Sequence, residues 1–164
     1  MANRFLPYGR QSIDDSDIAA VVEVLRGDWL TTGPTIEALE EAFAEAVGAD
    51  HAVACSNGTT ALHLALAAEG VGPGDICIVP AITFMATANA ALYCGAEVVF
   101  ADVDPDTGLL TPAIVEAALD AHPEIVCVIP VHLTGTACRM RGTARSPGII
   151  DVCEARGVKV VEDA

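Results

Sequence analysis

Lysine is almost absent from this sequence of 164 residues, in which Lys159 is the only example. Basic residues are scarce altogether: 8 lysines and arginines stand against 23 acidic residues, and the formal net charge is −15. A chain with this charge repels the phosphates of nucleic acids and the surfaces of anionic membranes. The charge therefore argues against a nucleic-acid or membrane partner. Lys159 itself falls in a predicted strand, where we expect an edge or end residue rather than a covalent catalyst.

Aromatic residues and long apolar runs are also scarce. Aromatics make up 4% of the chain, so aliphatic side chains and alanine must fill the core. No apolar run approaches the roughly 20 residues that span a bilayer, and the first ten residues lack the apolar core of a signal peptide. With 52% hydrophobic and 19% charged residues, the composition predicts a globular, cytoplasmic protein with one sizeable core.

No two cysteines have the C-x-x-C spacing of a zinc or redox motif. Four of the six, Cys55, Cys77, Cys94 and Cys127, lie in or beside apolar runs. Reduced cysteines that pack as small hydrophobes are typical of such positions. The 4 histidines supply no cluster of ligands, so we predict that the protein holds no metal.

Apolar periodicity predicts two helices followed by a regular alternation of strands and helices. The first two helices are expected over 12–26, capped by Ser12 or Asp15 and ended by Gly27, and over 35–47. The expected strands are 51–55, 76–79, 97–101, 125–130 and 158–161, and the expected later helices are 59–69, 83–93, 111–121 and 149–156. Residues 136–147 are expected to form a loop. This order predicts an α/β fold with a mostly parallel sheet and helices on both faces.

Ligands on such a sheet bind at the carboxyl ends of the strands. Residues 56–60 (SNGTT) follow one predicted strand and open a helix, where unpaired N–H groups and the helix dipole favour an anion. Gly58 would let the backbone approach the anion, and Thr59 and Thr60 would add hydroxyl donors. The segment is neither a P-loop nor a dinucleotide fingerprint. Phosphate binding and an ordinary capped turn both remain open.

Other side chains follow predicted strands at the same edge. The Asp163 carboxylate could hold a cationic ring nitrogen, as enzymes that use pyridoxal 5'-phosphate (PLP) require, or could cap a helix. Phe84 could stack on a flat cofactor or pack into the core. Asp102 and Asp104 would point to opposite faces if extended, which favours a turn with Asx bonding over a metal site. His132 ends a strand and is a weaker candidate for a proton carrier or substrate contact.

Taken together, these segments resemble the DegT/DnrJ/EryC1/StrS family of sugar aminotransferases over nearly the whole chain. The resemblance is carried by six segments in the same order: 27–34 (GDWLTTGP), 56–62 (SNGTTAL), 80–84 (PAITF), 100–104 (FADVD), 130–135 (PVHLTG) and 162–164 (EDA). The opening segment 6–13 (LPYGRQSI), followed by 21–25 (VVEVL), is most similar to one branch. That branch aminates C4 of a UDP-linked 4-keto-6-deoxy-N-acetylhexosamine on the way to pseudaminic acid.

The resemblance implies the large domain of a fold-type I PLP enzyme, with PLP as its cofactor. It assigns the cofactor phosphate to one group of positions, the pyridine ring to a second and the substrate to a third. These groups are Gly58, Thr59 and Thr60 for the phosphate, Phe84 (stacking) and Asp163 (ring nitrogen) for the ring, and Tyr8, Thr31 and His132 for the substrate.

The family reaction is a ping-pong transfer of an amino group, usually from glutamate, to a nucleotide-linked keto-sugar in a homodimer. The resemblance implies that the catalytic lysine, a phosphate-binding serine and the small C-terminal domain lie beyond Ala164. We therefore expect 1–164 to be the N-terminal part of the large domain, inactive alone and poorly stable because it exposes apolar surface.

Two features depart from the family pattern. Thr134 stands where the family often has Tyr or Phe, and 136–148 is unlike the acidic turn and helix that the family has there. Two other functions remain open. One is a PLP- or PMP-dependent sugar dehydratase, in which histidine replaces the lysine, and the other is a non-catalytic α/β module that binds phosphate.

Overall fold

The computed structural model describes residue 9, residues 11–143 and residues 146–164. The chain divides into two compact units, Met1–Ala54 and Cys55–Ala164, here called the amino-terminal unit and the sheet unit. In the described part of the chain, no helix has the length and apolar character needed to cross a membrane.

The amino-terminal unit contains helices α1 (Asp15–Arg26) and α2 (Pro34–Val47). Asp14 caps α1, because its carboxylate accepts hydrogen bonds from the N–H groups of Ser16 and Asp17 while Asp17 accepts one from the N–H of Asp14. The predicted caps, Ser12 and Asp15, are therefore wrong: the reciprocal pair needs acidic or polar side chains three residues apart, and Asp14 and Asp17 supply them. The Ser16 hydroxyl also donates to this carboxylate, and this bond, together with those from the N–H groups of Asp17 and Ser16, lowers the pKa of Asp14. Gly27 ends the helix, as predicted.

The predicted strand at 51–55 is wrong. These residues are not part of any strand, and the Ala54 N–H donates to the Glu40 carboxylate, 2.7 Å away, instead of to a strand. A strand needs a neighbour that pairs with its backbone groups, and the described residues offer none here.

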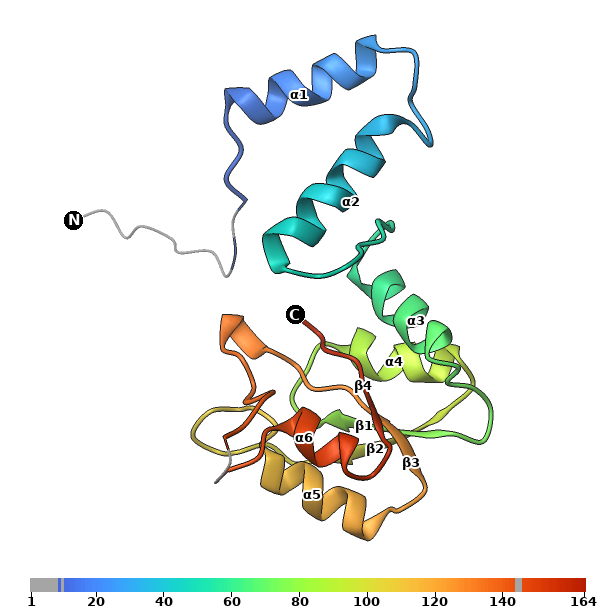
Figure 1. Ribbon diagram of the computed structural model, residues 1–164, viewed down its shortest axis with the longest axis vertical. Coiled ribbons are helices and arrows are strands. Elements are labelled where there is room, and N and C mark those ends of the chain that lie inside the picture. Colours follow the sequence, from blue (N-terminus) through green and yellow to red (C-terminus); the bar gives the residue numbers. More distant parts are fainter. Residues whose placement is uncertain (1–8, 10, 144–145) are drawn as a thin grey trace, which may run out of the picture. The chain divides into compact units, whose positions relative to one another are not determined.

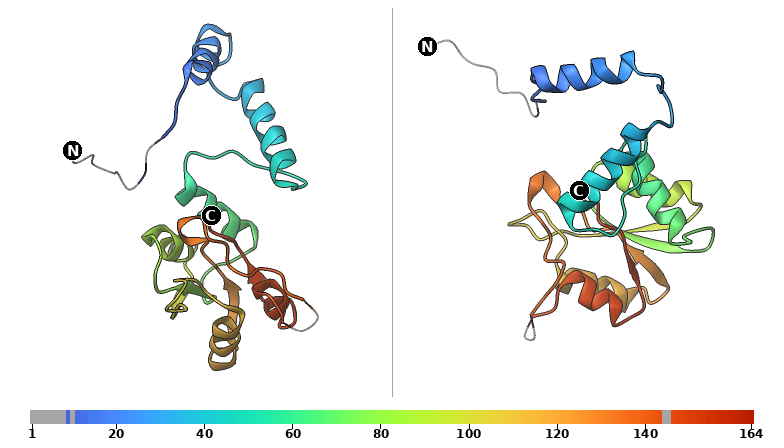
Figure 2. Two further views of the ribbon diagram at one scale, coloured as in Figure 1. Left: turned by 90° about the vertical axis from the view of Figure 1, so that its left-hand side faces the viewer. Right: turned by 45° about the horizontal axis from the view of Figure 1, so that its top comes forward.

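The sheet unit is built on four parallel strands in the order β2-β1-β3-β4. Their bounds are Glu97–Ala101 (β2), Ile76–Pro80 (β1), Ile125–Val128 (β3) and Lys159–Val160 (β4). Helices α3 (Gly58–Ala68) and α4 (Met85–Tyr93) lie on one face of the sheet, and α5 (Pro112–Ala121) and α6 (Ile149–Glu154) lie on the other (Figures 1 and 2). The predicted α/β fold with a parallel sheet covered on both faces is confirmed.

The core divides along the two faces, as the alternation of side chains along a strand requires. Cys77 and Val79 of β1 pack with α3 and α4 on one side. Ile78, between them, packs with α5 and α6 on the other. Strands β3 and β4 are shorter than predicted, although the Ile129 N–H still donates to Ile78 O and the Val161 N–H to Val128 O.

The cysteine prediction holds in part. Cys77 and Cys127 are buried and reduced, and Cys94 is half-buried, but Cys55 is exposed and was wrongly assigned to the core. Cys153 is also buried, and this burial raises the pKa of its thiol to about 11. A thiol with such a pKa stays protonated at neutral pH and is unreactive.

The described part of 136–147 is a loop, as predicted, and its ends are closely held. The N–H groups of Ile149 and Ile150 donate to the carbonyls of Arg139 and Met140. The loop enters through the short 3₁₀ helix η1 (Leu133–Gly135). Thr134 at its centre adopts a left-handed conformation, with φ 56°.

Candidate functional site

The predicted site residues of the sheet unit gather at the carboxyl edge of the sheet. From β1 the chain crosses to β2 on one side, while β3 and β4 lie on the other side, so the order of the strands reverses next to β1. Ligands of open α/β sheets bind outside the carboxyl ends of the strands at such a switch point. Helix α3 runs back toward the start of β1, and its N-terminus therefore lies at the same edge (Figure 1).

Asp163 follows β4 and is fixed to the edge through its backbone. Its N–H donates to Pro130 O over 2.9 Å, and its carbonyl accepts from the His132 N–H over 2.8 Å. These bonds extend the pairing of β3 with β4 past the ends of both strands. The half-buried side chain accepts a hydrogen bond at Oδ2 from the hydroxyl of Thr87, 2.5 Å away. The carboxylate therefore sits where a ligand on this edge would meet it.

Thr87 is a residue that the sequence analysis missed. It lies in α4 and is fully buried, and no other polar side chain is buried in the described part of the chain. Its Oγ1 is 2.7 Å from Oγ1 of Thr83, one helical turn earlier. A signal existed, since a hydroxyl at helical spacing among buried alanines needs a hydrogen-bond partner. The partner itself is 76 residues further on in the sequence, where no local pattern indicates it.

Phe84 caps the start of α4, in the short segment that follows the end of β1 at Pro80. Its side chain is 72% exposed, so the alternative that it packs into the core is wrong. An aromatic ring left open at the ligand edge of a sheet can stack on a flat ligand.

Asp104 forms the predicted Asx turn, because its Oδ1 accepts from the N–H groups of Asp106 and Thr107 and from the Thr107 hydroxyl. Within the described residues, the Asp102 carboxylate accepts a single bond, from the N–H of Val103 beside it. Among the residues that the structure describes, no three histidine, cysteine or acidic side chains come together as metal ligands.

The N-terminus of α3 fits an anion. Asn57 caps the helix, and its Oδ1 accepts from the Thr60 N–H over 2.9 Å. Within the described chain, the N–H groups of Gly58 and Thr59 have no acceptor. A Cβ added to Gly58 would meet nothing within 4 Å, so the space in front of this backbone is open. Two unpaired N–H groups at a helix N-terminus with open space before them form a typical phosphate site.

His132 lies beside Asp163, but both of its ring nitrogens are engaged. Nδ1 accepts from the Cys138 N–H over 3.0 Å, and Nε2 is 2.8 Å from Oε2 of Glu162. In the neutral ring this arrangement places the proton on Nε2, which donates to Glu162. The side chain is only 15% exposed. A proton carrier would have to give up one of these two bonds, so the geometry favours a tie between the ends of β3 and β4.

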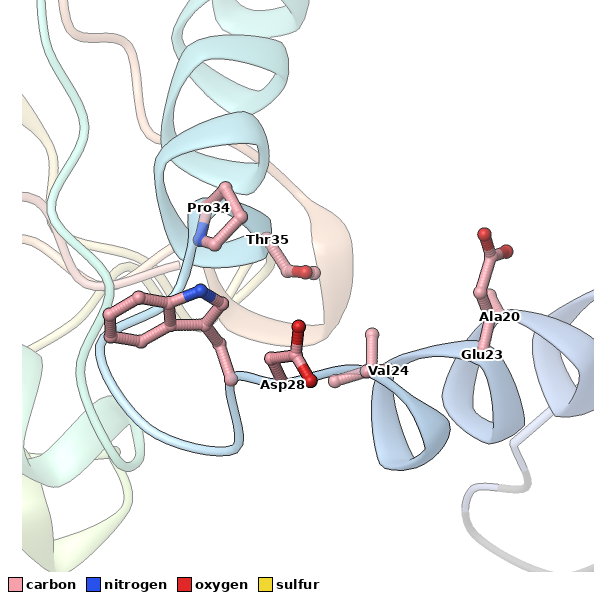
Figure 3. Close-up of a pocket in the computed structure, with 8 residues that line it drawn as sticks. Ala20, Glu23, Val24, Asp28, Pro34 and Thr35 are labelled. Atoms are coloured by element: carbon pink, nitrogen blue, oxygen red, sulfur yellow. The ribbon is translucent and has the colours of Figure 1, made fainter.

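Tyr8 lies outside the described residues. Thr31 is exposed in the loop between α1 and α2 of the amino-terminal unit. That unit has a pocket of about 370 Å³ between the end of α1 and the start of α2, where Val24, Asp28 and Pro34 face it (Figure 3). Thr31 does not line this pocket.

An open parallel sheet with helices on both faces is the fold that this chain shares with solved structures of PLP-dependent aminotransferases. The chain belongs to the DegT/DnrJ/EryC1/StrS aminotransferase family, whose model matches residues 11–164.

Two relatives are similar over almost all of the chain. The spore coat polysaccharide biosynthesis protein SpsC of Bacillus subtilis is 43% identical over 99% of the chain. The UDP-4-amino-4-deoxy-L-arabinose–oxoglutarate aminotransferase of Shewanella sediminis is 40% identical over 100% of it. The chain spans 40% of the length of each of these relatives.

Two solved structures are similar to this chain in both fold and sequence. DesV of S. venezuelae, in complex with a ketimine intermediate, superposes with a TM-score of 0.82 at 35% identity, over 90% of this chain and 38% of DesV. NtdA of Bacillus subtilis, with bound cofactor PMP, superposes with a TM-score of 0.80 at 33% identity, over 90% of this chain and 32% of NtdA.

Proposed function

We propose that this protein transfers an amino group to a nucleotide-linked keto-sugar with PLP as its cofactor. The observation that carries the proposal is the Asp163 carboxylate, fixed at the carboxyl edge of the sheet and open to a ligand there. The family of the chain supports the reaction class. The Shewanella relative is named for a UDP-linked amino-sugar and oxoglutarate, which supports a nucleotide sugar as acceptor and glutamate as amino donor.

The residues of this chain fit the cofactor. We assign its phosphate to the N-terminus of α3, where the N–H groups of Gly58 and Thr59 are unpaired, with hydroxyl support from Thr59 and Thr60. Phe84 would stack on the ring, and Asp163 would hold a proton on the ring nitrogen. When bound, PLP supplies the electron sink that makes amino transfer possible.

Lys159 has no part in this site. Its ammonium donates to the Glu69 carbonyl and lies 3.2 Å from the Glu69 carboxylate, at the start of β4 and therefore at the opposite edge of the sheet. The prediction of an edge or end residue agrees with this position. We propose that residues 1–164 form part of the PLP-binding large domain and that the lysine comes from a part of the protein outside them.

Finer assignments rest on the resemblance alone. We propose amination at C4 of a UDP-linked 4-keto-6-deoxy-N-acetylhexosamine by a homodimer, with Thr31 and Tyr8 as substrate contacts. For His132 we propose a contact through its ring face or its edge atoms rather than proton transfer, because both nitrogens are hydrogen-bonded.

The test uses the full-length protein, however far its reading frame extends past codon 164. After incubation with PLP and removal of the excess, addition of glutamate should convert the bound cofactor to its amine form, which is followed by absorbance. A UDP-linked 4-keto-hexosamine should then gain the amino group, seen by mass spectrometry. A protein that binds no PLP would refute the proposal, and loss of water from the sugar without gain of an amine would indicate a dehydratase instead.

Asp163→Asn tests the role of the carboxylate. Asparagine keeps the shape but cannot hold the positive charge of a protonated ring, so the glutamate half-reaction should slow by about 10²-fold or more. Asp106→Asn is the matched control, because Asp106 is an exposed carboxylate in the turn that follows β2. Equal rates in the two variants would show that Asp163 does not act on the cofactor.

A further inference from the structure

We propose that Thr87 is a positioning residue for Asp163, acting as the inner member of a two-hydroxyl chain from Thr83 through Thr87 to the carboxylate. The chain would fix the side-chain rotamer of Asp163 and leave Oδ1 as the oxygen that meets the ring nitrogen of the cofactor. This inference rests on the proposed function and adds to it a residue that acts through the acid.

The distances show a strong interaction between Thr87 and the carboxylate. Thr87 Oγ1 lies 2.5 Å from Asp163 Oδ2, within the range of about 2.5–2.7 Å for a hydroxyl bonded to a charged oxygen. Thr87 is fully buried, so water does not compete for the hydroxyl. Within the described chain, Oδ1 of Asp163 has no hydrogen-bond partner.

The hydroxyl of Thr87 has a single proton, which sets the direction of the hydrogen bonds between Thr83, Thr87 and Asp163. Thr87 Oγ1 is also 3.1 Å from the Phe84 carbonyl, the bond that a threonine inside a helix commonly makes to its own helix. The single hydroxyl proton points mainly to one acceptor, and the shorter contact, which goes to a charged oxygen, is the stronger one. Thr87 therefore donates to Asp163 and accepts from Thr83, whose Oγ1 is 2.7 Å away.

A merely structural tie between α4 and the end of β4 does not explain this arrangement well. The backbone of Asp163 is already held on both sides by Pro130 and His132. What those two bonds leave free is the rotation of the side chain, and the hydroxyl of Thr87 removes that freedom. A carboxylate whose orientation is set before the ligand arrives loses less conformational entropy when it binds.

The experiment measures the dissociation constants of two ligands for the full-length protein by calorimetry. One ligand is pyridoxamine 5'-phosphate, and the other is its analogue in which a C–H group replaces the ring nitrogen. Thr87→Val keeps the shape and removes the hydroxyl. It should weaken binding of pyridoxamine 5'-phosphate about 10-fold and leave binding of the analogue unchanged, because the analogue has no nitrogen for Asp163. Thr87→Ser should restore the wild-type value.

Each other result has a distinct meaning. Equal weakening of both ligands by Thr87→Val would show a structural role and overturn the inference, while leaving the proposed function intact. A wild-type protein that binds neither ligand would overturn the proposed function and this inference with it. If Thr87→Val does not fold, Thr83→Val removes the outer hydroxyl and should give a smaller loss with the same selectivity for the ring nitrogen. If Thr83→Val weakens binding of both ligands equally, the proposed role of the two hydroxyls is refuted.

Discussion

At the scale of single residues, Thr134 is the clearest point of strain in the sheet unit. A branched side chain in the left-handed region costs roughly 1–2 kcal/mol, and Thr134 has φ 56°. Its hydroxyl donates to the neighbouring Leu133 carbonyl and to no other acceptor in the described part of the chain. Asparagine enters this region more readily, so Thr134→Asn should raise the free energy of unfolding by about 1 kcal/mol, measured by urea denaturation.

Thr136 provides the matched control for this substitution. It is also an exposed threonine in the same loop, but its φ of −92° is ordinary. Thr136→Asn should therefore give no gain in stability. A gain of equal size in both variants would show that the effect comes from composition rather than from the backbone conformation.

Asp151 makes stability depend on pH. The N–H groups of Gly148 and Gly142 donate to its carboxylate over 2.7 and 2.8 Å, and these bonds lower the pKa of Asp151 below 3.8 in the folded chain. A carboxyl group with a lowered folded pKa stabilises the fold above its unfolded pKa, and this contribution disappears as the pH falls through the folded pKa. The wild-type protein should therefore lose stability below about pH 4.

Asp151→Asn should remove that part of the acid dependence, so that unfolding free energies at pH 7 and pH 3 differ less than in the wild type. Urea denaturation at both values measures it. Asp106→Asn removes an exposed acid from another turn, and its unfolding free energy should change between pH 7 and pH 3 as much as that of the wild type. If Asp151→Asn also shows the wild-type change, the two N–H bonds do not stabilise the charged form.

Single residues were predictable from the sequence where a local pattern specifies their role. The Asx turn at Asp104 and the helix end at Gly27 depend on neighbours within a few positions, and both were found. Asp163 and Phe84 were singled out because each follows a strand. Thr87 was missed because its partner lies far away in the sequence, and only the parallel sheet brings the ends of β1 and β4 to one edge.

At the scale of elements, two glycines allow the loop before α6 to fold back on itself. A Cβ on Gly148 would lie 2.3 Å from the Met140 carbonyl oxygen, and one on Gly142 would lie 2.2 Å from the Ser146 carbonyl oxygen. Backbone atoms on both sides cannot move apart without breaking the bonds to Asp151. Gly148→Ala should therefore lower the free energy of unfolding by at least about 1–3 kcal/mol.

Gly72→Ala is the control for this prediction, since an added Cβ there meets nothing within 4 Å. It should change the unfolding free energy by less than about 0.5 kcal/mol. Similar losses in both variants, measured by thermal or urea unfolding, would mean that the close packing at Gly148 is not what the glycine provides. The same contacts show that the stretch that departs from the family pattern still has a defined structure where it is described.

Helices and strands with a clear periodicity were predicted well, whereas the strand expected at 51–55 was not found. The helices of the sheet unit and strands β1 and β2 fall within two residues of the expected positions. Residues 51–55 were predicted to be a strand because they are apolar and follow a helix, yet Val53 is exposed and no strand of the described chain pairs with it. Apolar character predicts burial, but a strand also needs a partner for its backbone, which a local pattern cannot supply.

At the scale of the whole molecule, the two units differ in how they are stabilised. The sheet unit buries aliphatic side chains on both faces of its strands. In the amino-terminal unit α1 has no buried side chain, and its apolar residues Ile18, Val21 and Leu25 are each more than half exposed. An isolated helix of this length is marginal in water. Helix α1 therefore depends largely on local interactions such as the capping box of Asp14.

Hydrogen exchange of the 164-residue chain tests this difference. Amides of α1 should exchange on the order of 10³-fold faster than those of β1 and β3, because opening α1 breaks no core contact whereas exposing the strands requires unfolding of the unit. Helix α5 is the internal control. It is even shorter than α1 but buries Val115 and Leu119, so its amides should exchange as slowly as the strands.

Equal protection of α1 and α5 would contradict the prediction and show that the apolar face of α1 is covered. If that protection falls on dilution, a second copy of the chain covers the face, and if it does not, the cover comes from the same chain.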